Sequence, residues 1–189
     1  MGKIKAVTIH AGHNPKGKIA CGASDYIDES TEARIVVKKV KALLKKAGIK
    51  VYDCTVNNGT SQRDVLMKIC KKCNSKIRDV DISIHFNSAS HQTKKNKKTT
   101  GTEVWVKSKE GIRGHLANKM CLGLANLGFR NRGVKTTDNL YVLNKTSEPA
   151  LLIEVCFVSD PDDAMLYKKR KHDVANAIAK SILEYSNAG

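Results

Sequence analysis

The sequence has no long hydrophobic run and few aromatic residues. Its apolar stretches, such as ALLIEVCFV at 150–158, are far shorter than the ~20 residues of a membrane-spanning helix. Aromatic residues make up only 5% of the chain, and no strand-like segment carries the aromatic pattern of an RNA-binding sheet. We therefore predict no membrane span. The same scarcity argues against a nucleic-acid-binding module.

The amino-terminal stretch MGKIKAVTIHAGH lacks the apolar segment and the small-residue cleavage site of an export signal. We interpret it as a first strand and expect synthesis in the cytoplasm. The sequence also lacks a second CxxC motif that would pair with Cys70 and Cys73 in a zinc finger. We therefore expect free, packed thiols at the six cysteines, which are Cys21, Cys54, Cys70, Cys73, Cys121 and Cys156.

Acidic residues are scarce relative to basic ones, with 18 Asp and Glu against 34 Lys and Arg, which gives a net charge of +16. Such a charge favours an anionic partner. Nucleic acid and an acidic polymer such as a bacterial cell wall both satisfy this requirement, and charge alone does not choose between them. The expected contacts are two lysine-rich segments, one with Lys94, Lys95, Lys97 and Lys98, the other spanning 168–171.

Strand-like and helix-like segments alternate along the 189 residues. The expected strands are 5–11, 49–55, 79–87, 102–108, 139–144 and 150–159, and the expected helices are 30–47, 60–72, 111–127 and one or two within 160–185. This order predicts a single α/β domain, with a central mixed, mostly parallel sheet of about six strands flanked by helices on both faces. Ligand sites in such sheets lie at the carboxyl ends of the strands.

Metal-type ligands lie at or just beyond two of these strand ends and before the first helix. His13 follows the first strand, His85 lies near the end of the third, and Glu29 precedes the first helix. Two imidazoles and one carboxylate form the ligand set of a catalytic zinc ion, which leaves a fourth position for water. The hypothesis is therefore a Zn²⁺ site. Glu32 is an alternative ligand to Glu29, whose charge could instead serve only the helix dipole.

Two further residues stand out near the predicted ligands. Glu154 lies inside an apolar strand, where a carboxylate is costly unless it is paired, metal-linked or catalytic. We predict that it is the general acid/base of a hydrolase, with a structural ion pair as the alternative. His10, three residues before His13, is interpreted as a core residue or as a support for the metal site.

Several motifs together resemble those of the zinc-dependent N-acetylmuramoyl-L-alanine amidases of the amidase-3 type. The motifs are Gly12-His13, the glutamate of DEST, SIHFN at 83–87, RGVK at 132–135, LYVL at 140–143 and PALLIEVCFVSDPDDA at 149–164. They occur in the family's order along essentially the whole chain. The resemblance looks closest to the catalytic domains of endolysins from phages and prophages of Gram-positive hosts.

This resemblance implies that His13, Glu29 and His85 bind zinc and that Glu154 is the catalytic acid/base. The implied reaction is hydrolysis of the amide bond between N-acetylmuramic acid and L-alanine in peptidoglycan. Residues 1–189 would form the catalytic domain, without a separate wall-binding domain. One departure is His10, where the family often has an acidic residue, and another is the first loop, NPKGK, which is often glycine-rich.

The same resemblance suggests substrate contacts and a place of action. Asn87 is expected to bind the peptide or to fix His85, with an ordinary turn asparagine as the alternative. Arg63 and Arg132 are candidates to bind carboxylates of the stem peptide, with solvated surface arginines as the alternative. The expected partners are Gram-positive peptidoglycan and its anionic polymers, reached through a holin-type or another export route. Two alternatives are a zinc peptidase that cuts within the stem peptide and a basic nucleic-acid-binding module, which needs no zinc.

Overall fold

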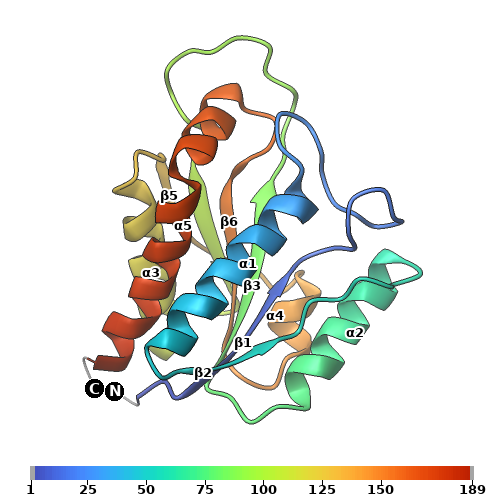
Figure 1. Cartoon of the computed structure of the whole chain (residues 1–189), viewed down its shortest axis with the longest axis vertical. Coiled ribbons are helices and arrows are strands. Elements are labelled where there is room, and N and C mark those ends of the chain that lie inside the picture. The colour runs from blue at the N-terminus through green and yellow to red at the C-terminus, as the bar shows by residue number, and fades with distance from the viewer. Residues whose placement is uncertain (1–2, 188–189) are drawn as a thin grey trace.

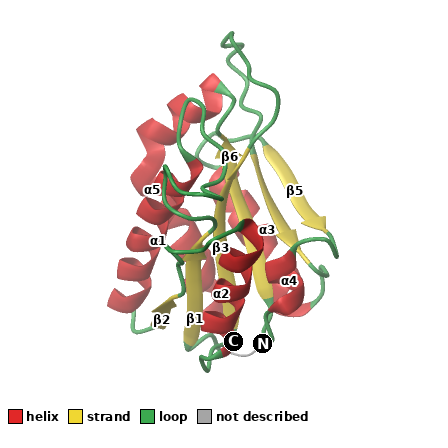
Figure 2. Cartoon of the chain, turned by 90° about the vertical axis from the view of Figure 1, so that its right-hand side faces the viewer, coloured by secondary structure: helices red, strands yellow, loops and turns green. Residues whose placement is uncertain are grey.

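A computed structural model describes residues 3–187 and shows one sheet between two layers of helices (Figures 1 and 2). The strands are β1 Ala6–Ala11, β2 Lys50–Asp53, β3 Val80–Asn87, β4 Thr102–Val106, β5 Asn131–Thr136 and β6 Ala150–Phe157. The helices are α1 Glu29–Lys46, α2 Gln62–Asn74, α3 Gly111–Ala125, α4 Tyr141–Lys145 and α5 Pro161–Asn187.

The strand order across the 6-stranded sheet is β2-β1-β3-β6-β4-β5. Neighbouring strands are parallel except for β4 and β6, which run antiparallel. Helices α1, α3 and α5 pack on one face through the largest apolar cluster, whereas α2 and α4 cover the other face (Figure 2). The predicted α/β fold with a mixed, mostly parallel sheet is confirmed.

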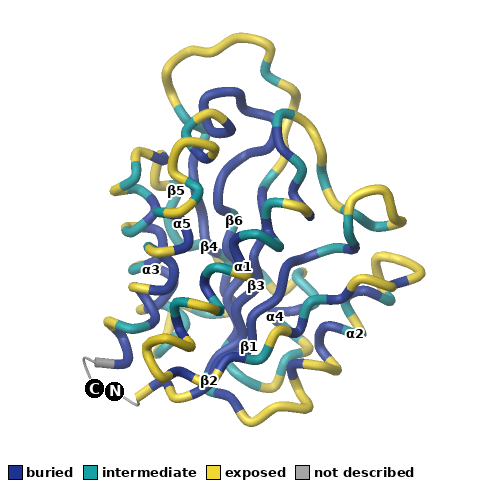
Figure 3. The backbone as a smooth tube through the Cα atoms, in the orientation of Figure 1, coloured by how far each residue is buried: buried dark blue, intermediate teal, exposed yellow. Residues whose placement is uncertain are grey.

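The two faces of the sheet differ in polarity, and β3 shows why. Ile82 and Ile84 belong to the large apolar cluster beneath α1, α3 and α5. Because successive side chains of a strand point to opposite faces, Asp81, Ser83 and His85 face the side of α2 and α4. All three are buried, and β3 lies in the buried centre of the molecule (Figure 3). The sheet therefore carries buried polar groups on the face where the predicted ligands lie.

A buried ion pair holds the beginning of β3. The Arg78 guanidinium donates to both carboxylate oxygens of Asp81, through Nε at 2.9 Å and Nη2 at 2.8 Å. The Thr8 hydroxyl also donates to Asp81. The side chains of Arg78 and Asp81 are 2% and 0% exposed. This pairing satisfies a charge that would otherwise be costly inside the sheet.

One expected element differs from the observed structure, and one observed strand was not expected. The segment 139–144 is predicted as a strand, but its last four residues, 141–144, lie in the short helix α4. A short apolar run does not distinguish a strand from a helical turn, and here Val142 and Leu143 are buried against different clusters. Strand β5 was not predicted, because NRGVKT lacks the apolar alternation of a half-buried strand. In the structure, none of its residues is fully buried. The closing segment forms the single helix α5.

The expectation of free cysteines is confirmed. All six cysteines are free thiols. No helix within residues 3–187 is both long and apolar enough to cross a membrane.

Candidate active site and metal centre

The predicted metal ligands and the predicted acid/base meet at the carboxyl end of the parallel strands. His85 lies in β3 and Glu154 in β6, and they are direct partners in the register of these two strands. His13 follows β1 by two residues, and Glu29 is the first residue of α1. The register explains why a histidine and a glutamate that are distant in sequence come together.

Three of these side chains form a cluster with the composition of a metal site. His85 Nδ1 lies 2.9 Å and His13 Nε2 lies 3.3 Å from the same oxygen of Glu29. One potential ligand atom from each residue lies within 4.8 Å of the others. The two imidazole rings meet edge to face at 5.0 Å. Two nitrogens and one oxygen in this arrangement fit a catalytic zinc ion.

The local structure selects Glu29 rather than Glu32 for this cluster. The backbone N–H of Ala23 donates to Glu29 Oε2 at 2.9 Å, and that of Phe86 donates to Oε1 at 3.2 Å. The Glu32 carboxylate instead accepts hydrogen bonds from Tyr167 and Lys171, away from the histidines. Glu29 therefore belongs to the histidine cluster, and its role is not limited to a favourable charge at the helix N-terminus.

Two glycines let the backbone approach these side chains. A Cβ atom at Gly12 would lie 2.0 Å from Cε1 of His85. A Cβ atom at Gly22 would lie 2.5 Å from Oε2 of Glu29 and 2.8 Å from Cδ2 of His13, and the φ angle of Gly22 is +79°. Glycine is therefore required at both positions for the observed packing.

Electrostatics links Glu29 to the two histidines. Burial alone would raise the pKa of Glu29, but hydrogen bonds and charge interactions with His13 and His85 outweigh burial and lower it. Burial would lower the pKa of His13, but the hydrogen bond and the charge of Glu29 raise it. Glu29 is therefore an anion that attracts positive charge, as a metal-binding carboxylate must be.

Glu154 has the environment of a general acid/base. Its Oε2 is buried and has no hydrogen-bond partner among the described residues. Burial, followed by the negative charges of Glu29 and Glu103, raises the pKa of Glu154 well above its ordinary value. A carboxyl group with a raised pKa can both accept and donate a proton near neutral pH.

His10 lies beneath this site and is fully buried on β1. Its Nδ1 lies 3.5 Å from the Ser83 hydroxyl, and its Nε2 has no partner within the described part of the chain. Burial, followed by the charge of His85, lowers the pKa of His10 to about 3. His10 is therefore a neutral residue of the interior.

The cluster opens into a cavity of ≈ 410 Å³. His13, Glu29, His85, Asn87 and Glu154 all contribute to its wall. Gln62, Asn139 and Tyr141 also line it, and sequence reasoning did not identify them as site residues. Tyr141 could have been found through the LYVL motif, had 139–144 been recognised as the approach to a helix.

The two predicted arginines differ in position. Arg63 lies exposed in the first turn of α2 and does not line the cavity, although its neighbour Gln62 does. Arg132 lies on β5, where its Nε donates to Glu103 at 2.7 Å. Glu103 is the register partner of Glu154 across β4 and β6. Arg132 is therefore connected to the site through one carboxylate.

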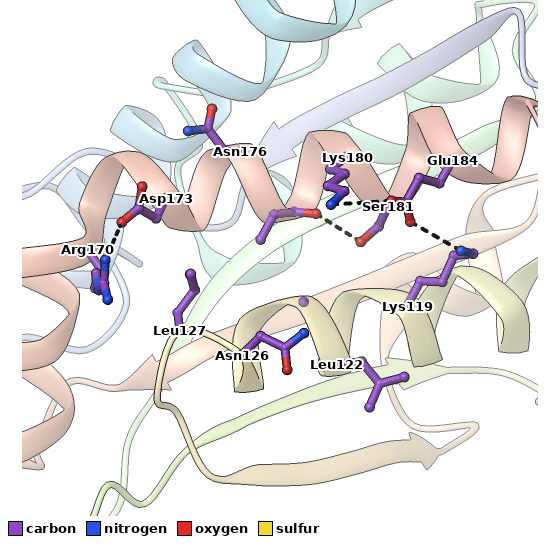
Figure 4. A pocket seen from close by; sticks show the side chains of 12 residues that line it. Lys119, Leu122, Asn126, Leu127, Arg170, Asp173, Asn176, Lys180, Ser181 and Glu184 are labelled. Atoms are coloured by element: carbon purple, nitrogen blue, oxygen red, sulfur yellow. Dashed lines mark hydrogen bonds and ion pairs between the residues drawn. The ribbon is translucent and has the colours of Figure 1, made fainter.

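A second, larger cavity of ≈ 640 Å³ lies between α3 and α5 (Figure 4). Its acidic residues are paired, since Glu184 lies 3.3 Å from Lys119 and Asp173 lies 3.1 Å from Arg170. None of the predicted site residues lines it. The predicted metal ligands and the predicted acid/base therefore lie at the smaller cavity.

The α/β sheet carries a two-histidine, one-glutamate cluster, a candidate metal site of the kind found in metal-dependent hydrolases. The N-acetylmuramoyl-L-alanine amidase family matches residues 7–184. The chain therefore belongs to the N-acetylmuramoyl-L-alanine amidase family of the amidase-3 type.

Several individual proteins are similar to this chain. The chain is 33% identical to an uncharacterized protein of Clostridium perfringens, over 94% of this chain and 51% of that protein. It is 30% identical to the endolysin of Bacillus phage SPP1, over 97% of this chain and 66% of that protein. The catalytic domain of an endolysin targeting Clostridia difficile has the same fold, with a TM-score of 0.84, 24% identity and coverage of 95% and 97%. The chain spans about half the length of the two Clostridium perfringens proteins it matches, 51% of each.

Proposed function

We propose that the protein is a zinc-dependent N-acetylmuramoyl-L-alanine amidase that hydrolyses the amide bond between N-acetylmuramic acid and L-alanine in bacterial peptidoglycan. The observation that carries this proposal is the cluster of His13, Glu29 and His85 beside Glu154. Membership of the amidase family supports the choice of bond.

The three ligand residues would hold the ion at the cavity wall. When bound, zinc supplies a Lewis acid that polarises the scissile carbonyl and lowers the pKa of water. His13 and His85 contribute neutral nitrogen ligands, and Glu29 contributes one negative charge. This set leaves part of the metal charge uncompensated, which favours hydrolysis.

Glu154 would move the proton during the reaction. Its unpartnered Oε2 takes a proton from the attacking water and then delivers it to the nitrogen of L-alanine as the amide bond breaks. Its raised pKa suits both halves of this transfer. Asn87, in the same cavity wall, and Arg132 and Arg63 would contact the stem peptide.

We also propose that the protein acts in the Gram-positive cell wall and binds the anionic polymers there. The lysine-rich loop 88–101 supports this, because its backbone is held rather than free. Asp162 accepts hydrogen bonds from the backbone N–H groups of Asn96 and Lys97, at 2.8 and 2.9 Å. The loop with its four lysines is therefore anchored next to the end of the sheet that carries the site (Figure 1). Salt should weaken such binding.

The test of the reaction is mass spectrometry of the products released from purified peptidoglycan by zinc-loaded protein. Free stem peptides with a new L-alanine amino terminus are expected. Fragments cut within the stem peptide would assign the protein to the zinc peptidases instead. Absence of any product on several wall types, with zinc bound, would overturn the enzymatic proposal and return attention to anionic polymers, including nucleic acid.

A further inference from the structure

Glu103 is a buried carboxylate at the edge of the site. Its charge helps to raise the pKa of Glu154, but its hydrogen bonds have no role in the proposed mechanism. Its side chain is only 4% exposed. Oε1 accepts hydrogen bonds from Asn87 Nδ2 at 3.0 Å and from the Trp105 indole N–H at 3.1 Å. Oε2 accepts from Nε of Arg132 at 2.7 Å. Three donors from three strands therefore converge on one carboxylate.

Arg132 is held on two sides by this arrangement. Besides the bond to Glu103, its guanidinium lies over the Phe157 ring, 5.0 Å from the ring centroid. Among the described residues, Nε makes the only hydrogen bond of this side chain, so both terminal nitrogens keep their donors. The Arg132 side chain is 32% exposed and can reach a ligand.

We propose that Glu103 is a positioning residue that fixes Arg132 as the receptor for a carboxylate of the substrate's stem peptide. A guanidinium binds a carboxylate best through two parallel N–H donors. Because Glu103 occupies Nε, the pair of terminal nitrogens stays available for this bidentate contact. Phe157 supports the plane of the guanidinium.

The position of Glu103 links this receptor to the reacting bond. Glu103 is the direct register partner of Glu154, and its other oxygen holds Asn87, which lines the cavity of the metal cluster. The network thus extends from the cavity wall to Arg132. A stem peptide that enters the cavity would pass Asn87 before its carboxylate meets Arg132.

This inference rests on the proposed amidase function, and its test uses soluble glycan-linked stem peptides in three forms. One form has all carboxylates free, one is amidated at its acidic second residue, and one is amidated at the carboxyl terminus. Wild type should cleave the free form with a kcat/KM about 10- to 100-fold higher than one of the amidated forms, mainly through KM. The form that loses activity identifies the carboxylate.

Two variants separate the receptor from the residue that positions it. Arg132→Gln should abolish the preference for the free carboxylate, and Arg132→Lys should restore only part of it because an ammonium lacks the planar pair of donors. Glu103→Gln should weaken the preference for the free form. The double variant should show the same lack of preference as Arg132→Gln alone. Arg130→Gln removes an exposed positive charge two residues away and is the matched control.

The possible outcomes are distinct. If wild type cleaves all three forms equally, or if Arg132→Gln lowers kcat/KM equally for all of them, the carboxylate receptor is wrong while the amidase function stands. If Glu103→Gln and Arg132→Gln reduce the preference for the free form additively, Glu103 does not act through Arg132. If zinc-loaded wild type cleaves none of the forms, the proposed function itself fails. Should Glu103→Gln not fold, as judged by its thermal unfolding, Arg132→Gln alone decides on the receptor.

Discussion

The close approach of Gly12 to His85 leads to a sharp prediction about metal binding. In Gly12→Ala, the new Cβ would lie 2.0 Å from Cε1 and 2.2 Å from Nε2 of His85. Carbon atoms in contact lie ~3.5–4.0 Å apart, so the ring or the loop must shift by about 1.5 Å. Such a shift breaks the 2.9 Å contact between His85 and Glu29. Lost support of a ligand costs 10–100-fold in metal affinity, and we expect about 100-fold here, or about 2.7 kcal/mol.

The assay is a competition for zinc between the protein and a chromophoric chelator, together with thermal unfolding to check the fold. Gly123→Ala is the matched control, because its Cβ would meet only ordinary contacts, the nearest at 3.5 Å from Ala177. The control should bind zinc as wild type does. Wild-type zinc affinity in Gly12→Ala would refute the role given to His85 in the metal site.

Three further predictions concern stability and the lysine-rich loop. Burial and His85 lower the pKa of His10 to about 3, so only the unfolded chain gains this proton as pH falls. In urea unfolding, the free energy of unfolding should fall by about 2 kcal/mol from pH 7.5 to 5, and His10→Gln should not show this loss. Arg78→Met leaves Asp81 buried without its partner and should lower the free energy of unfolding by ~3–5 kcal/mol. Lys41→Met, which breaks a partly exposed pair, should lower it by ~1 kcal/mol or less. Asp162→Ala removes two hydrogen bonds to the loop, so trypsin should cut at 94–98 faster than in wild type, with zinc binding unchanged; equal cleavage rates would contradict the anchoring role.

The arrangement of the site could be predicted where it depends on strand order alone. His85 lies near the carboxyl end of β3 and Glu154 in the carboxyl half of β6, and parallel strands bring such positions to one edge of a sheet. The choice between Glu29 and Glu32 could not be made this way. It depends on which carboxylate meets the backbone of Ala23 and Phe86, and that requires the path of the loop before α1.

Residues that depend on unrecognised elements were beyond sequence reasoning. Glu103 occupies a polar position in the alternating segment TEVWVKS, which is typical of a solvent-facing side chain. It is buried because β5 extends the sheet and brings Arg132 to it, and β5 itself has no apolar pattern. Likewise, Tyr141 enters the cavity only because 141–145 is a helix rather than a strand.

The most direct test of the account is a comparison of wild type with Glu154→Gln, in which zinc content and the release of stem peptides from peptidoglycan are measured on the same preparations. We predict about one zinc ion per chain in both proteins, since Glu154 is not among the proposed ligands, and a 10²–10⁴-fold lower rate in the variant, the usual contribution of a general acid/base. Zinc binding with an undiminished rate in Glu154→Gln would contradict the account, as would a variant that loses the metal together with the activity.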